Sequence, residues 1–489
     1  MQKRKNVTPL LHCLRSIHDT MKPDEGHQKK KTRCPVMEGE GKMKKLVIFV
    51  LAIMLVCGGM ISISQATEQG WYEYTLNKDG TVTIVSVSED CADQVIPSEL
   101  DGKTVTSIGN DAFYGCQKLK NVVIPEGVTS IGKNTFNYCY NLISITIPDS
   151  VQSIGEGLAA GSYKFKELHF SKEHPTFAFN NGALIRKSDL TVLRVTDTKA
   201  QEYELPWGIT KIAYNAFESH KAKSIIIPDS VTTIGANAFA ECKNLTNVYI
   251  PGSVTTIGTQ AFHSCTKLKS VRIPNSVTQI GNGAFDWCDS LETIEVDPDH
   301  PVYAFGNGAL IVKDTREMIY CAGATKGTYE IPGGIEKIGQ MAFHGNKNLR
   351  EIIIPDSVTS IGPYAFCDCK SLTTIRLPEG LIVISPDMFG YSAKLKEVNI
   401  PNTVTDIESY AFESCKSLKK IVLPEGVKNI GRYAFMGCTG LTSIEIPSTV
   451  NIIESTAFDG CKNLVCTVKE GSYAKEYCEK NNIKYVVAE

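Results

Sequence analysis

The sequence predicts an α/β-type repeat solenoid, and three observations support this prediction. First, prolines recur at an interval of 23 residues within three runs. Second, apolar residues recur at the same places around each of these prolines. Third, two longer units stand 126 residues apart and resemble each other. A fixed period of about 20–50 residues indicates stacked units rather than separate globular domains.

The repeated proline belongs to an Ile-Pro or Leu-Pro pair. Stacked units of this length are expected to form about fifteen coils between Val95 and Val468. A period in the twenties is typical of a leucine-rich repeat solenoid. The prolines are Pro125 and Pro148, then Pro228, Pro251 and Pro274, then Pro332, Pro355, Pro378, Pro401, Pro424 and Pro447.

A single unit, Leu119 to Cys139, reads L-x-x-V-x-I-P-x-x-V-x-x-I-G-x-x-x-F-x-x-C. The alternation of Val122 and Ile124 predicts a short parallel strand with one side buried. Proline then ends the strand, because it has no N–H to donate, and a turn follows. Phe136 is expected to lie in a short helical turn and to fill the centre of the coil. Stacking would bury these residues in one continuous apolar interior.

Two units are longer than the others, with an interval of 35 residues instead of 23. They begin near His174 and His300, each of which precedes a proline. Alternating apolar residues around Lys187–Thr191 and Lys313–Glu317 predict a β-hairpin added to each coil. A repeated turn explains the two histidines better than catalysis does.

Both ends of an open stack need a cap. The residues from Trp71 predict a hairpin that turns at Lys78–Gly80, and the last residues predict a short helix, a turn at Asn481–Asn482 and a final strand. The expected organisation is a polar basic extension at 1–42, disordered or not translated; a signal peptide or signal anchor at 43–66; an N-terminal cap at 67–110; a solenoid at 111–464 with insertions near 171–202 and 297–328; and a C-terminal cap at 465–489.

The segment after Met43 has a short positive region, an apolar stretch and small residues at Ser64 and Ala66. This pattern predicts a secretory signal peptide that is cleaved after Ala66, with Met43 as a possible start. The alternative is an uncleaved membrane anchor at residues 46–63, because the apolar run is about long enough to span a bilayer. Either interpretation places the chain from Thr67 onward in a secreted or cell-surface protein.

Charge argues against a nucleic-acid partner. From Thr67 onward the chain has 39 Lys and Arg against 48 Asp and Glu, a formal charge of about −9. This balance leaves no excess of basic residues for a phosphate backbone, so we expect no basic patch and no nucleic-acid binding. The membrane would be involved only through the N-terminal segment, if that segment stays uncut.

At the unit beginning at Ile227, which reads IPDSVTTIGANAFAECKNL, the sequence resembles the BspA-like leucine-rich repeats of bacterial cell-surface proteins. The resemblance extends from about Trp71 to Glu489 and rests on the spacing IP…V..IG..AF..C..L. It implies a secreted or surface-bound protein, with adhesion to host matrix proteins or other cells as an expected role.

Cysteine at one repeat position is interpreted as a buried thiol that packs the coil. Secretion would permit disulfides, and neighbouring coils would bring these residues close enough, so pairing stays an alternative. Cys367 and Cys369 form a C-x-C without the further ligands of a zinc site, so no metal is expected. The ladder consists of Cys116, Cys139, Cys242, Cys265, Cys288, Cys369, Cys415, Cys438 and Cys461.

Binding is expected on the outward residue between the two inward residues of each strand, because that position varies from coil to coil while the inward ones do not. The prediction is a non-enzymatic extracellular protein with a protein or glycan ligand, no catalytic residues and no cofactor. The alternatives are a glycan- or cell-wall-active enzyme on a solenoid scaffold and a passive surface spacer. The proposed ligand-binding residues are Tyr249, Arg272, Glu295, Arg376 and Asn399.

Overall fold

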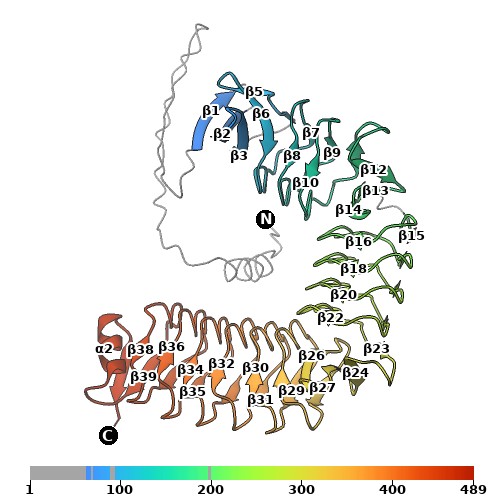
Figure 1. Ribbon diagram of the computed structural model, residues 1–489. Helices are drawn as coiled ribbons and strands as arrows, with labels where there is room; N and C mark the ends of the chain where they lie inside the picture. Colours follow the sequence, from blue (N-terminus) through green and yellow to red (C-terminus); the bar gives the residue numbers. More distant parts are fainter. Residues whose placement is uncertain (1–61, 68–69, 89–93, 197–199, 489) are drawn as a thin grey trace, which may run out of the picture. The chain divides into compact units, whose positions relative to one another are not determined.

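The computed structural model describes residues 62–67, 70–88, 94–196 and 200–488, which form a stack of short coils (Figure 1). Each regular coil has two short strands, one before and one after the repeated proline. Most strands pair in parallel with their counterparts in the next coil, as β7 (Asn121–Val123) pairs in register with β9 (Ser144–Thr146). The predicted solenoid with 23-residue coils is therefore confirmed.

The first strands of the coils form several short parallel sheets. Besides β7 and β9, they are β4 (Gln94–Val95), β11 (Glu167–His169), β15 (Glu202–Glu204), β17 (Ser224–Ile226), β19 (Asn247–Tyr249), β21 (Ser270–Ile273), β23 (Thr293–Val296), β27 (Gly327–Glu330), β29 (Leu349–Ile353), β31 (Thr374–Arg376), β33 (Glu397–Asn399), β35 (Lys420–Val422), β37 (Ser443–Glu445) and β39 (Val465–Val468).

The second strands were not predicted, because two residues are too few to show an alternating pattern. They contain the isoleucine of the repeated Ile-Gly pair in most coils. They are β6 (Lys103–Ile108), β8 (Ser130–Ile131), β10 (Ser153–Ile154), β16 (Lys211–Ile212), β18 (Thr233–Ile234), β20 (Thr256–Ile257), β22 (Gln279–Ile280), β28 (Lys337–Ile338), β30 (Ser360–Ile361), β32 (Val383–Ile384), β34 (Asp406–Ile407), β36 (Asn429–Ile430) and β38 (Ile452–Ile453).

The glycine of the Ile-Gly pair allows one coil to lie directly on the backbone of the coil before it. A Cβ atom added to Gly258 would lie 2.4 Å from the backbone nitrogen of Ala236, and one on Gly281 would lie 2.3 Å from that of Thr259. Any side chain at these positions would therefore separate the coils. In these coils the glycine serves close stacking rather than an unusual φ angle, and four other coils have Ala213, Ser385, Glu408 and Glu454 at the same position.

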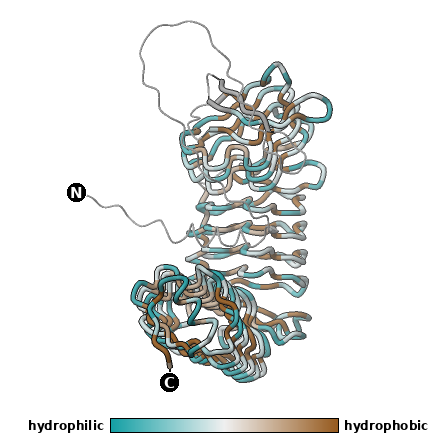
Figure 2. Tube along the Cα trace, turned by 90° about the vertical axis from the view of Figure 1, so that its left-hand side faces the viewer, coloured by the Kyte–Doolittle hydropathy of each residue, from teal (hydrophilic) through white to brown (hydrophobic). Residues whose placement is uncertain are grey.

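The repeated phenylalanines form a column in the interior of the coils. Phe239, Phe262 and Phe285 stack with ring centroids 5.1 and 5.5 Å apart, and their planes are nearly parallel. These side chains are at most 1% exposed, and Val122, Ile124, Ile131 and Phe136 of the first unit are also buried. Hydrophobic and hydrophilic residues recur at the same places from coil to coil (Figure 2). The predicted continuous apolar interior is present in each of the packed segments.

The expected helical turn at this phenylalanine is wrong, and the fold is nearly all strand. Residues on both sides of Phe239 have left-handed φ angles, 52° at Asn237 and 58° at Glu241. The N–H groups of Asn237, Phe239 and Glu241 donate to the carbonyls of Thr259, Ala261 and His263 in the next coil. An α-helix would use these N–H groups internally. Here the chain forms consecutive turns instead, and these N–H groups donate to carbonyls of the neighbouring coil.

The two predicted hairpin insertions are confirmed. In the first, β12 (Phe177–Asn180), β13 (Ala183–Arg186) and β14 (Thr191–Val195) pair antiparallel, and β14 then pairs in parallel with β16. In the second, β24 (Tyr303–Gly306), β25 (Ala309–Val312) and β26 (Glu317–Cys321) repeat this arrangement and join β28. Each hairpin thus supplies the second strand of its own coil.

Both predicted caps contain the expected elements. At the N-terminal end β2 (Gly70–Leu76) and β3 (Val82–Val87) form the hairpin, and β5 (Glu99–Leu100) pairs with β6. At the other end α2 (Tyr473–Lys480) precedes β40 (Lys484–Val487), which pairs with β39. Ser472 caps the helix by accepting from the N–H of Lys475. Among the described residues α2 is the one α-helix. No helix in that part of the chain is long and apolar enough to cross a bilayer.

The predicted signal segment at 43–66 lies mostly outside the described residues. Its last residues belong to β1 (Ser62–Thr67), which pairs antiparallel with β2, so that Ala66 lies opposite Trp71. Cleavage after Ala66 would therefore remove all of β1 except Thr67. The sheet of the cap would then end at β2.

Candidate functional site

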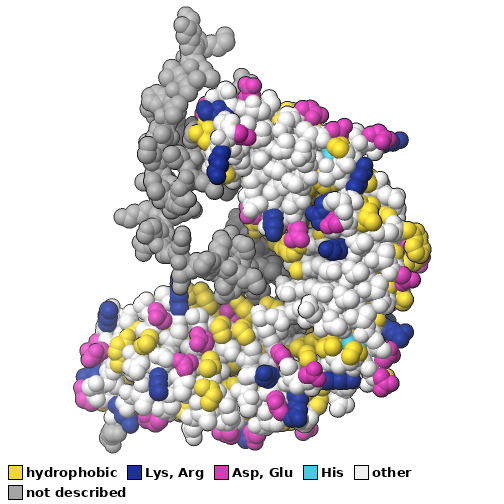
Figure 3. All heavy atoms as spheres, in the orientation of Figure 1, with side chains coloured by type: hydrophobic (Ala, Val, Ile, Leu, Met, Phe, Trp, Pro, Cys, Tyr) yellow, Lys and Arg dark blue, Asp and Glu magenta, His cyan; other side chains and the backbone are white. Residues whose placement is uncertain are grey.

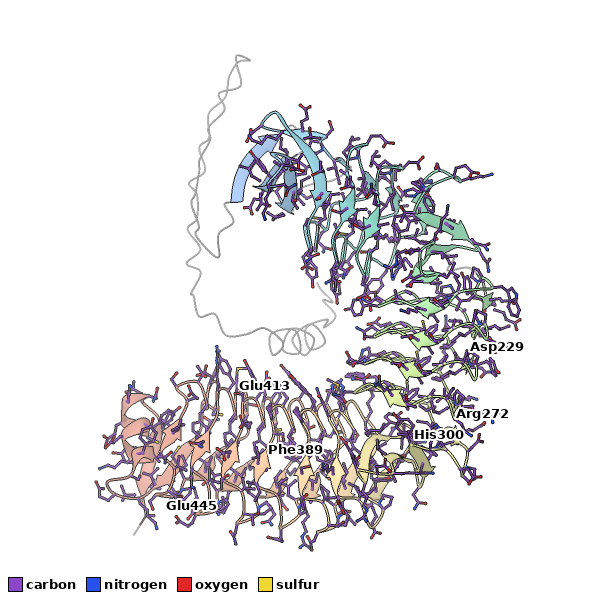
Figure 4. The ribbon with its side chains drawn as sticks, in the orientation of Figure 1. Asp229, Arg272, His300, Phe389, Glu413 and Glu445 are labelled. Carbon is purple, nitrogen blue, oxygen red and sulfur yellow. The ribbon has the colours of Figure 1, made fainter. Side chains whose placement is uncertain are left out.

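The strand face presents the predicted outward residues in consecutive coils. Tyr249 is 55% exposed on β19, and the side chain of Arg272 is 62% exposed on β21. Arg272 lies directly beside Glu295, because β21 and β23 pair in register. β19 also lies against β21, although the two belong to different sheets, so Tyr249 is on the coil next to that of Arg272. The guanidinium of Arg272 also lies 3.4 Å from the carboxylate of Asp297, which keeps it on the outer surface (Figure 4).

Arg376 and Asn399 form a second group on the same face. They lie side by side on β31 and β33, in a different sheet from Tyr249. The side chain of Arg376 is 66% exposed and approaches Glu379 at 4.0 Å. The five predicted residues thus form two groups, which the insertion at β24–β26 separates along the chain.

One exposed aromatic residue on this side was missed by the sequence analysis. Trp207 is 78% exposed in the turn that follows β15. In the other regular coils the residue after the repeated proline is acidic, Asn, Ser or Gly. The tryptophan at this position could therefore have been recognised from the sequence as an exposed residue. Figure 3 shows hydrophobic side chains on the surface beside β15.

Trp207, Ile226 and Tyr249 are large exposed apolar residues on three successive coils, Trp207 in a turn and the other two on strands. Glu204 on β15 pairs with Ile226 on β17, and Ile226 pairs with Tyr249 on β19. Ile226 is 47% exposed. We define Trp207, Ile226 and Tyr249 as the apolar patch of the strand face.

A buried polar cluster lies where the second insertion interrupts the stack. The carboxylate of Asp286 accepts hydrogen bonds from Nδ1 of His263 and Nδ1 of His344, both at 2.8 Å. Asp286 and His344 are 58 residues apart, and they meet because the inserted coil has no residue between them on this side. Lys347 and Asp289 pair across the same junction at 2.7 Å.

The electrostatics of this cluster favour charged groups despite their burial. Burial opposes ionisation of Asp286, but the attraction and hydrogen bonds of the two histidines lower its pKa. Burial also opposes protonation of His263, but attraction to Asp286 and the hydrogen bond to it outweigh that effect and raise the pKa. The cluster therefore holds an ion pair inside the junction.

Ser264, His263 and Asp286 have the spacing of a catalytic triad without its accessibility. The hydroxyl of Ser264 lies 3.1 Å from Nε2 of His263. A nucleophile must reach its substrate, however, and Ser264 is only 6% exposed. Its own backbone N–H donates to the backbone carbonyl of Asp286, and that of Cys265 donates to the backbone carbonyl of Phe262. Neither N–H is free to stabilise an oxyanion, so the cluster joins two coils and does not supply an active site.

The histidines at the insertions hold turns, as predicted. Nε2 of His174 lies 3.1 Å from the carbonyl of Pro148, and its Nδ1 accepts from the N–H of Thr176. Lys187 donates to the carbonyl of His174 at 2.7 Å. His300 repeats these contacts with Pro274, Val302 and Lys313. Each histidine thus fastens the start of a hairpin to the preceding coil.

The cysteine ladder has a hydrogen-bonding role that its spacing alone did not reveal. The thiol of Cys415 donates to the carbonyl of Phe389 at 3.2 Å, and Cys438 donates to Phe412 at 3.0 Å. Where a coil has serine instead, Ser392 donates to Phe366 at 2.7 Å in the same manner. Burial raises the pKa of Cys415, which keeps this thiol protonated. The same bond to a phenylalanine carbonyl is made by Cys139, Cys242, Cys265, Cys288, Cys369 and Cys461.

Cys415→Ser is expected to be more stable than Cys415→Ala by about 0.5–1.5 kcal/mol, because only serine keeps a donor for the Phe389 carbonyl. Denaturant unfolding of the two variants under reducing conditions measures this difference. Equal stabilities would show that the thiol acts only by filling space.

The remaining ladder residue, Cys116, is also buried, as is Cys367 of the C-x-C pair. Within the described ranges no three His, Cys, Asp or Glu side chains lie close enough together to hold a metal ion.

The model of the BspA type leucine rich repeat region, six copies long, matches residues 97–196, 193–310 and 328–465. The fold is similar to a leucine rich cell surface protein from Faecalibacterium prausnitzii, with 26% identity over 85% of this chain and 96% of that one and a TM-score of 0.48. It is also similar to a leucine-rich repeat protein from Bacteroides ovatus, with 27% identity over 86% and 98% and a TM-score of 0.41.

The pneumococcal vaccine antigen PcpA is similar too, with 19% identity over 87% of this chain and 98% of that one and a TM-score of 0.46. A search of curated proteins found no match. The family model covers well over half of the residues and agrees with the repeat spacing. The chain therefore belongs to the BspA-type leucine-rich repeat family.

Proposed function

We propose that this chain is a non-enzymatic, secreted or cell-surface binding protein, and that the apolar patch of its strand face recognises a protein partner. Membership of the BspA-type family supports a surface role. The observation that carries the proposal is the exposure of Trp207, Ile226 and Tyr249, at 78%, 47% and 55%, on three successive coils.

The composition of this surface favours a protein partner. Tryptophan, tyrosine and arginine are the residues that most often dominate protein interfaces. Here Trp207 and Tyr249 are followed by Arg272 in the next coil. Neighbouring coils hold the strands in fixed register, so these side chains are presented on a rigid surface that loses little freedom on binding.

Location outside the cell is part of the proposal. It rests on the family and on the signal-like segment at 43–66. The partner is therefore sought among proteins of the cell's surroundings, by pull-down with the chain starting at Thr67. N-terminal sequencing of the native protein reads whether it begins there.

Trp207→Ala combined with Tyr249→Ala is expected to weaken binding to the purified partner by about 2 kcal/mol or more, roughly 30-fold, because both are central exposed aromatics. The matched control is Ile353→Ala with Val422→Ala, which removes exposed apolar residues from other coils of the same face. Calorimetry or surface plasmon resonance measures the two affinities.

Equal affinities for the aromatic variant and the wild type would place the binding surface elsewhere. An equal loss of affinity in the control variant would show that the partner binds the strand face without preference for the apolar patch. Finding no partner at all would favour the passive spacer, and turnover of peptidoglycan, glycans or peptides by the purified chain would favour the enzyme.

A further inference from the structure

Lysine and arginine gather along one edge of the coils, in the segment between the buried thiol or hydroxyl and the first strand. The net charge of the chain, from which no basic patch was expected, does not show how charges are distributed. From this position four successive coils read NKNLRE, CKSLTT, SAKLKE and CKSLKK, so that eight cations stand against two acidic residues, Glu351 and Glu397. We define the basic edge as Arg350, Lys394, Lys396, Lys416, Lys419 and Lys420.

Backbone hydrogen bonds hold these segments in register. The N–H of Thr373 donates to the carbonyl of Arg350, and the N–H of Lys396 donates to that of Thr373, both at 2.9 Å. The N–H of Ser417 donates to the carbonyl of Ala393 at 3.1 Å. Neighbouring coils are therefore about 4.8 Å apart along the edge. Lys394 and Lys396 therefore lie beside Lys416, Lys419 and Lys420 of the next coil, and Arg350 lies two coils before Lys396.

The six cations of the basic edge are exposed and unpaired. Every one of them is exposed, and within the described part of the chain none forms an ion pair. Other cations nearby do: Lys347 pairs with Asp289 at 2.7 Å, Lys370 with Asp368 at 3.4 Å and Arg376 with Glu379 at 4.0 Å. Unpaired like charges in a row repel one another, and a linear anion would relieve that repulsion.

We propose that the basic edge binds an extended anionic polysaccharide, whose carboxylate or sulfate groups lie along the row of cations. Such a polymer can follow successive coils and place its charges at intervals. This site is separate from the apolar patch, so the proposal goes beyond the protein partner proposed above.

Three observations favour a polysaccharide over a nucleic acid. Duplex DNA carries one charge per about 1.7 Å, far denser than a row of cations spaced by coils of about 4.8 Å. The body of the chain is acidic, by 48 Asp and Glu to 39 Lys and Arg, and would repel so dense a polyanion. The four segments also contain no Phe, Tyr or Trp on which single-stranded bases could stack.

The test compares the full-length chain with a variant carrying Lys394→Glu, Lys396→Glu, Lys416→Glu and Lys419→Glu. The probes are heparin, which is sulfated, and polygalacturonate, which is carboxylated; both are titrated at several salt concentrations. The wild type is expected to bind at least one of the two. In the variant, the affinity should fall roughly tenfold or more, and the slope of log affinity against log salt should become shallower by about three to four.

The control variant carries Lys133→Glu, Lys211→Glu, Lys337→Glu and Lys428→Glu, the same change of charge at exposed lysines beside second strands. It is expected to keep most of the affinity. If the glutamate variant of the edge fails to fold by circular dichroism, Lys→Gln at the same four positions replaces it.

Absence of binding to both polysaccharides at low salt would overturn the proposal. So would equal losses in the edge and control variants, or tighter binding to duplex DNA of equal charge. The Trp207→Ala and Tyr249→Ala variant is expected to bind heparin like the wild type, so failure of the protein-binding proposal and failure of this one are separate results.

Discussion

Replacing Phe389 by alanine is expected to lower the free energy of unfolding by about 3–5 kcal/mol. The ring lies 5.6 Å from that of Phe366 and 5.2 Å from that of Phe412, and the side chain is fully buried. In Figure 4 it lies within the stack, between Glu413 on one side and Glu445 on the other. Alanine would leave a cavity at the contact between two coils, where the stack cannot collapse without moving both.

Two variants and one measurement test this expectation. Phe389→Leu keeps most of the volume and is expected to cost less than about 1.5 kcal/mol. Phe179→Ala removes a ring that is 43% exposed on a hairpin and contacts Phe170, and it should cost less than about 1.5 kcal/mol. Denaturant unfolding gives the totals, and hydrogen exchange shows whether amides of the adjacent coils lose protection first. A loss below about 1 kcal/mol for alanine would mean that the column does not hold the coils together.

Asp286→Ala is expected to destabilise the protein by about 3–5 kcal/mol, because it leaves two buried histidines without their shared acceptor. The carboxylate is fully buried, and the side chain of His344 is only 3% exposed. Asp289→Ala is the matched control at the same junction. Its pair with Lys347 is about a third exposed, so the loss should stay below about 1 kcal/mol.

The stability difference between the wild type and Asp286→Asn should depend on pH. The lowered pKa of Asp286 makes its contribution complete above about pH 4 and lost as the pH falls further. The raised pKa of His263 makes its contribution complete below about pH 6.5 and lost as the pH rises beyond that. Unfolding at several pH values should therefore show the largest difference between about pH 4 and 6.5. A difference that does not change with pH would show that the cluster is uncharged.

The stacked interior could be predicted because every unit has apolar residues at the same inward positions. Val122, Ile124 and Phe136 recur since each coil must match the apolar face of its neighbour. The turns around Phe239 could not be predicted, because their left-handed residues are Asn237 and Glu241 and not glycines. Only the geometry shows that these turns exchange hydrogen bonds between coils.

The candidate surfaces were predicted in part. The alternation of apolar and polar residues identified Tyr249 and Arg272 as outward residues. The 23-residue period places them on neighbouring coils. The contact of Asp286 with His344 could not be foreseen, since it requires the inserted coil to leave them adjacent across 58 residues. Trp207 and the basic edge could have been found by comparing units position by position, which a count of total charge does not do.

The hydrogen bonds between coils have a consequence for how this gene can change. Every regular coil offers the next one the same set of N–H groups and carbonyls, and the two blocks 126 residues apart repeat even the histidine and lysine contacts of their hairpins. Recombination between such similar stretches of DNA would add or delete whole coils while leaving every junction intact. Each such change in copy number would lengthen or shorten the area that the protein offers to its surroundings.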